Sequence, residues 1–134
     1  MAKFFEWFDT TAAELRADPR CEALVSNNFD VQHTGGGCLV WSREVGEAED
    51  GCVDSIWILA WDSEGASDMC ADPCAPVWMA GRHRDDEWLE VGGCTLLQAI
   101  AVGNRLHTMP VDRLTGNTLT RDEFRARLRQ GGER

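Results

Sequence analysis

Residues 53–61, with the sequence VDSIWILAW, limit the possible folds of this chain more than any other segment. They are rich in β-branched and aromatic residues, which favour a pleated strand. The second half of the segment is apolar on both faces, as is typical of a strand inside a sheet. We therefore expect 53–61 to form the central strand of the domain.

The flanking sequence predicts two β-hairpins. Residues 29–33 and 39–45 alternate between apolar and polar side chains on either side of a glycine-rich turn. Residues 76–83 and 87–91 predict a second hairpin, which ends at Gly92-Gly93. Together with the central strand, these segments predict an antiparallel meander of about five strands.

The N-terminal segment predicts two helices. Apolar residues follow helical spacing over 4–15, and the proline at position 19 ends this first helix because it disfavours a helical conformation in the preceding residue. Asp18 can cap a second, short helix in which Pro19 is the first residue, and Asn27-Asn28 can end it.

The C-terminal third also predicts two helices. Thr95 and Thr120 are each followed three residues later by Gln or Glu, the capping-box pattern. The helix over 95–107 is expected to bury four apolar residues, Leu97, Ile100, Ala101 and Leu106. The full prediction is one α+β domain over residues 1–134, with the N- and C-terminal helices packed on one face of the sheet.

The charge distribution favours a basic binding partner. The chain has 13 Lys and Arg against 23 Asp and Glu, a net charge of −10, which repels nucleic acid and anionic membranes. From residue 44 to 81 there are nine acids and no Lys or Arg. We take these acids as candidate partner-binding residues: Glu44, Glu47, Glu49, Asp50, Asp54, Asp62, Glu64, Asp68 and Asp72. The last helix, in contrast, carries four arginines, which are expected to pair with the protein's own acids or with a partner.

Other features of the sequence favour a reduced, cytoplasmic protein that needs no cofactor. No continuous apolar stretch has the length of a signal peptide or a membrane span. The six cysteines are scattered through a chain long enough to form its own core, so most are expected to be small buried residues. The glycine run is not followed by the Lys-Ser/Thr of a phosphate-binding loop, and the EF-hand pattern is absent.

Two alternative functions depend on cysteine and histidine. His33 and Cys38 flank the glycine turn, where an imidazole could stabilise a thiolate nucleophile, although turn glycines and a strand-starting cysteine account for the same pattern. A structural zinc site could use four residues, Cys70, Cys74, His83 and Cys94, but the second closely spaced pair typical of such sites is missing.

Five tryptophans are expected on the sheet: Trp41, Trp57, Trp61, Trp78 and Trp88. A helix covers only one face of a small sheet, so we expect one or two of these rings to be exposed as anchors for a partner.

The run His33-Thr-Gly-Gly-Gly-Cys-Leu-Val-Trp41, in so short and acidic a chain, resembles small accessory proteins of plasmids and bacteriophages. This resemblance implies an inhibitor of host defence, as in anti-CRISPR and anti-restriction proteins, several of which present acids in place of DNA phosphates. We therefore expect a non-enzymatic acidic protein that engages a basic, nucleic-acid-binding host protein.

Overall fold

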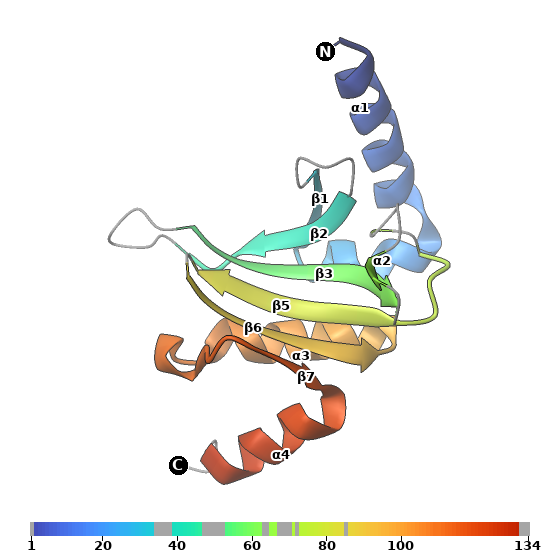
Figure 1. The fold of residues 1–134 in the computed structure, drawn as a ribbon. Helices are drawn as coiled ribbons and strands as arrows, with labels where there is room; N and C mark the ends of the chain where they lie inside the picture. Colours follow the sequence, from blue (N-terminus) through green and yellow to red (C-terminus); the bar gives the residue numbers. More distant parts are fainter. Residues whose placement is uncertain are drawn as a thin grey trace.

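The chain forms an α+β fold in which one mixed sheet, mostly antiparallel, is combined with helices from both ends of the chain (Figure 1). The computed structural model describes residues 2–33, 39–46, 53–62, 65–66, 71, 73–84 and 86–131. The helical elements are α1 (Ala2–Ala17), η1 (Pro19–Cys21), α2 (Glu22–Ser26), α3 (Leu96–Thr108), η2 (Val111–Arg113) and α4 (Arg121–Gly131). The strands are β1 (Asp30–His33), β2 (Leu39–Glu44), β3 (Asp54–Asp62), β4 (Gly65–Ala66), β5 (Trp78–Arg84), β6 (Glu87–Cys94) and β7 (Asn117–Thr120).

The main sheet has six strands in the order β1-β2-β3-β5-β6-β7, and the two-residue strand β4 pairs with the end of β3. The prediction of five strands in a meander is therefore corrected. The additional strand, β7, pairs parallel to β6, with Leu89 opposite Asn117 and Val91 opposite Leu119. Parallel neighbours need a crossover connection, and α3 provides it between β6 and β7.

The core lies between the sheet and the helices. One cluster of buried residues includes Leu15 of α1, Leu24 of α2, Ile100 of α3 and Phe124 of α4, together with inward-facing strand residues such as Ile58. Figure 1 shows α3 running along one face of the sheet, while α1 and α4 extend beyond its two edges. The opposite face, which we call the outer face, carries a smaller cluster of Val40, Leu59 and Met79.

Local capping signals fix the helix starts as predicted. The Asp18 side chain accepts a hydrogen bond from the Arg20 backbone N–H at 2.9 Å and begins η1, and Asn28 after α2 has a positive φ of 68°. The capping box of Thr95 and Gln98 is complete at the start of α3. Thr120 and Glu123 exchange the same two bonds at the start of α4.

The buried face of α3 differs from the prediction. Ile100 and Leu106 are buried as expected, but Leu97 is 68% exposed and Ala101 is also exposed. The reason is Gly103, where an added Cβ would lie 3.1 Å from Ile56 Cγ2. Because Gly103 has no side chain, the helix approaches the sheet closely at this position, which turns Leu97 and Ala101 towards solvent.

Candidate functional site

The acids of the segment that the structure describes, Glu44, Asp54 and Asp62, do not lie together on the sheet. Glu44 is exposed and pairs in register with Ser55, near the start of β3, whereas Asp62 is the last residue of that strand. At about 3.3 Å per residue, the seven steps along β3 from Ser55 to Asp62 separate these two positions by roughly 23 Å. The acids at the other predicted positions, Glu47, Glu49, Asp50, Glu64, Asp68 and Asp72, lie outside the described residues.

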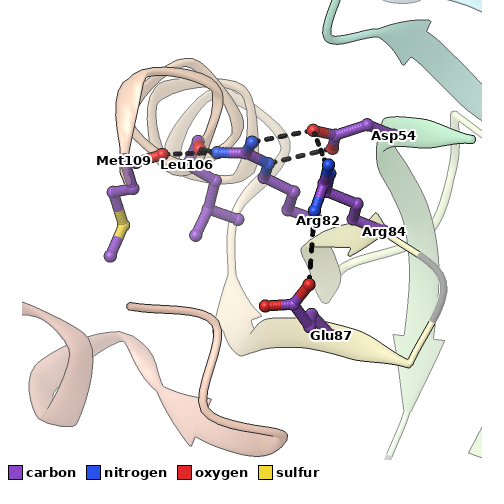
Figure 2. Close-up of polar contacts among 6 residues, drawn as sticks. All are labelled: Asp54, Arg82, Arg84, Glu87, Leu106 and Met109. Carbon is purple, nitrogen blue, oxygen red and sulfur yellow. Dashed lines mark hydrogen bonds and ion pairs between the residues drawn. The ribbon is translucent and has the colours of Figure 1, made fainter. Parts of the chain in front are cut away.

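Asp54 is not exposed, so the expectation that it belongs to a binding surface is wrong. Its side chain is 7% exposed, and both carboxylate oxygens accept hydrogen bonds from Arg82, at 3.0 and 2.8 Å. Arg82 also donates to the backbone carbonyls of Leu106 and Met109, at 2.9 and 2.6 Å (Figure 2). Arg82 thus connects the start of β3 to the C-terminal end of α3, where the last carbonyls no longer have the N–H donor four residues on that an α-helix supplies.

Arg84 extends this network towards the β5–β6 turn. Its guanidinium lies 3.8 Å from Asp54 and 3.3 Å from Glu87 (Figure 2). A buried charge pair with additional hydrogen bonds supports the fold, because removing one partner leaves an uncompensated charge in the core. We therefore assign Asp54 to the fold and not to partner binding.

A second arginine, Arg43, contacts His107 of α3 and favours its neutral form. Arg43 donates to the Asn27 carbonyl at 2.7 Å and approaches His107 Nδ1 at 3.1 Å, and its guanidinium lies 4.5 Å from the centre of the Phe29 ring. Burial, followed by the positive charges of Arg43 and Arg82, lowers the pKa of His107 below its ordinary value. The imidazole is therefore neutral in the folded protein at neutral pH, and Nδ1 accepts the bond from Arg43.

The residues of the predicted Cys/His pair are only partly described. His33 ends β1, and its ring packs nearly perpendicular to the Phe8 ring, with a centroid distance of 5.4 Å. Cys38 lies outside the described residues, so Cys/His catalysis stays a prediction.

The described members of the predicted zinc set do not come together. Cys94 is buried in the core, where burial raises the pKa of its thiol, whereas His83 lies on the outer face of the sheet. Cys74 is exposed and accepts a hydrogen bond from Arg20 at 2.7 Å. Cys70 lies outside the described residues, and within the described part of the chain no three His, Cys, Asp or Glu side chains are grouped to hold a metal ion.

The outer face carries a group of polar and aromatic residues that the sequence did not predict as a unit. We call it the outer-face cluster: Trp57, His83, Trp88, Glu90 and Thr118. Glu90 accepts hydrogen bonds from His83 Nε2 at 3.0 Å and from the Thr118 hydroxyl at 3.1 Å. The hydrogen bond from His83 lowers the pKa of Glu90 below its ordinary range, so this carboxylate is ionised at neutral pH.

Gly81 makes room for this arrangement. It pairs with Trp57 on β3 and with Glu90 on β6, and an added Cβ would lie only 2.9 Å from His83 Cε1. The His83 ring therefore lies over the glycine, 5.0 Å from the centre of the Trp57 ring. Any larger residue at position 81 would force the His83 ring to move, because Cβ contacts below 3.0 Å are not tolerated.

The tryptophans divide between the two faces. Trp41 and Trp78 are buried in the core, at 0% and 1% exposure. Trp57 and Trp88 are partly exposed on the outer face, as are His83 at 29% and Glu90 at 24%. The side chain of Trp61 lies outside the described set. Two rings on the sheet thus have the partial exposure expected of binding anchors.

Comparisons of the chain with protein-family models, with curated proteins and with solved structures found no match. In the part of the chain that the structure describes, no helix has both the length and the apolar character needed to cross a membrane.

Proposed function

We propose that this chain is a non-enzymatic binding protein that engages a basic, nucleic-acid-binding protein through the outer face of its sheet. The observation that carries the proposal is the placement of strand charges. The arginines of the described strands, Arg43, Arg82 and Arg84, all occupy inward-facing positions of the alternation. The outward positions of the described strands carry three acids, Asp30, Glu44 and Glu90, and no Lys or Arg, and Asp30 is paired with Arg16 of α1.

This surface has the chemistry that a cationic side chain prefers. A Lys or Arg placed over a tryptophan ring gains about 0.5 to 2 kcal/mol, depending on how well it is shielded from water. The outer-face cluster offers two partly exposed rings, Trp57 and Trp88, beside the ionised carboxylate of Glu90. Tryptophan is also the residue type that most often dominates the energy of protein interfaces.

The remaining acids contribute long-range attraction. The net charge of −10 raises the encounter rate with a basic protein, most strongly at low salt. The acids from Glu44 onwards precede β3 in the sequence, whereas those from Asp62 onwards lie at its end or follow it. These two groups could contact separate parts of a partner. The outer-face cluster and the negative charge together suit an inhibitor that occupies the phosphate-binding surface of a host nucleic-acid-binding protein.

Affinity capture from the native host with matched variants tests the proposal. The outer-face variant is Trp57→Ala with Glu90→Gln, and its control on α1 is Trp7→Ala with Glu14→Gln, which removes the same groups from another exposed surface. We expect the wild-type chain and the control to retain the same basic protein, identified by mass spectrometry. The outer-face variant should lose it while keeping its cooperative unfolding transition.

The acidic segments are tested by association kinetics with the captured protein. Neutralising Glu47, Glu49 and Asp50 together should slow association, and the effect should shrink as salt rises from about 0.1 M to about 1 M, since the Debye length falls from about 10 Å to about 3 Å. Asp54 is left out of this set because its loss would destabilise the fold. Equal capture by the outer-face variant and the wild-type chain would contradict the proposal.

A further inference from the structure

A cavity of about 260 Å³ lies beneath α4, between this helix, β6 and the segment that follows α3. Its floor is apolar and comes from elements far apart in the sequence: Leu89 of β6, Met109 after α3, and Phe124 and Leu128 of α4. Leu89 and Phe124 are 1% and 2% exposed, so the floor reaches the core of the domain.

Two of the four polar residues that line the cavity, Arg113 and Arg127, carry positive charge, and the other two, Thr115 and Gln130, are neutral. Arg113 of η2 and Arg127 of α4 both line it, and the lining contains no Asp or Glu. Arg127 donates to the neutral oxygens of Thr115 at 2.9 Å and Asn117 at 3.4 Å. Glu123, one helical turn before Arg127, interacts with that charge and is itself exposed outside the cavity. Arg113 forms no ion pair with any described residue.

This local charge contrasts with the rest of the molecule. From residue 105 to 134 the chain has seven basic and four acidic residues, although its net charge is −10. Arg127, the α4 arginine that lines the cavity, donates its hydrogen bonds to neutral oxygens, although the charge of Glu123 lies one helical turn away. Planar guanidinium groups match a carboxylate in geometry as well as in charge.

We infer that this cavity binds a small organic monocarboxylate, whose apolar body lies on Leu89, Phe124 and Leu128 and whose carboxylate meets Arg113 and Arg127. At roughly 30 Å³ per water-sized group, 260 Å³ admits about nine non-hydrogen atoms. Inorganic phosphate would leave the apolar floor uncovered, and a neutral apolar molecule would leave both guanidinium groups unused. The inference is independent of the outer-face proposal, because Leu89 faces the core side of the sheet.

Benzoate and benzamide form a matched pair of probes, because they have nearly the same size and shape but differ in charge. Each is titrated into the full-length protein and followed by the backbone amide signals in two-dimensional NMR spectra. We expect benzoate to shift the signals of Thr115, Phe124 and Leu128 and to bind about tenfold or more tightly than benzamide, as a charged hydrogen bond implies. Inorganic phosphate should not displace it.

Two arginine variants separate the cavity from general charge. Arg113→Gln should reduce the affinity for benzoate and narrow its advantage over benzamide, with Arg127 supplying the charge that remains, whereas Arg125→Gln, at an exposed position of α4 outside the cavity lining, should leave both affinities unchanged. Both substitutions are at positions outside the buried core, so we expect both variants to fold. The dispersion of the amide signals in the same spectra checks this. Equal affinities for benzoate and benzamide, no shifts at the lining residues, or equal losses in the two variants would each overturn the inference.

Discussion

Replacing Arg82 with alanine tests the claim that the Asp54–Arg82 pair belongs to the fold. The substitution removes both bonds to Asp54 and both bonds to the carbonyls of Leu106 and Met109. Breaking a buried ion pair costs about 3 to 5 kcal/mol, because the remaining charge is left without compensation. Arg84, 3.8 Å from Asp54, partly offsets that charge, so we expect a loss of about 3 to 4 kcal/mol in the free energy of unfolding.

Urea denaturation followed by tryptophan fluorescence measures this loss, with thermal unfolding as a second measurement. The double variant Asp54→Ala with Arg82→Met should recover part of the lost stability, because no charge then remains buried alone. The control Arg16→Ala removes the exposed ion pair with Asp30 and should cost less than about 1 kcal/mol. A loss of less than about 1 kcal/mol for Arg82→Ala would refute the structural role of the pair.

Three further predictions concern single residues. The pKa of His107 is lowered in the folded protein from its ordinary value of 6.5, so the unfolded chain takes up a proton first as the pH falls. The free energy of unfolding should therefore fall as the pH drops below 6.5, and His107→Gln should flatten that part of the pH profile. A thiol reagent at neutral pH should modify Cys74 well before Cys94, as peptide mass spectrometry would show, since Cys94 is buried and its thiol pKa is raised. Gly103→Val should destabilise by about 1 to 3 kcal/mol in urea denaturation through overpacking against Ile56, and an unchanged midpoint would contradict the close contact between α3 and the sheet.

The sequence predicted those elements whose signals are local. The capping residues Thr95 and Thr120 begin helices where expected, and the apolar segment 53–61 corresponds closely to β3, which pairs with β2 and β5. Strand β7 was not predicted, because its four residues contain one buried apolar side chain, Leu119, and no readable alternation. Its pairing depends on the free edge of β6, which only the tertiary structure reveals.

The candidate site was predictable only in part. Tryptophan number and the alternation of strands predicted that some rings would be exposed, and Trp57 and Trp88 are the two that the structure leaves partly accessible. The role of Asp54 could not be predicted, because an acid that begins a strand gives no sign of the arginine 28 residues away that buries it. The contact of His83 with Glu90 likewise depends on the register of β5 and β6 and on the space above Gly81.

The most direct test of the outer-face proposal is to observe the tryptophan indole N–H signals by NMR while an oligoarginine peptide is added at low and high salt. The account predicts that the signals of Trp57 and Trp88 shift and that those of the buried Trp41 and Trp78 do not. The shifts should require Glu90 and should be absent in Glu90→Gln at the same peptide concentration. Binding of the peptide without any movement of the Trp57 and Trp88 signals would contradict the account, since the cation would then sit elsewhere on this acidic protein.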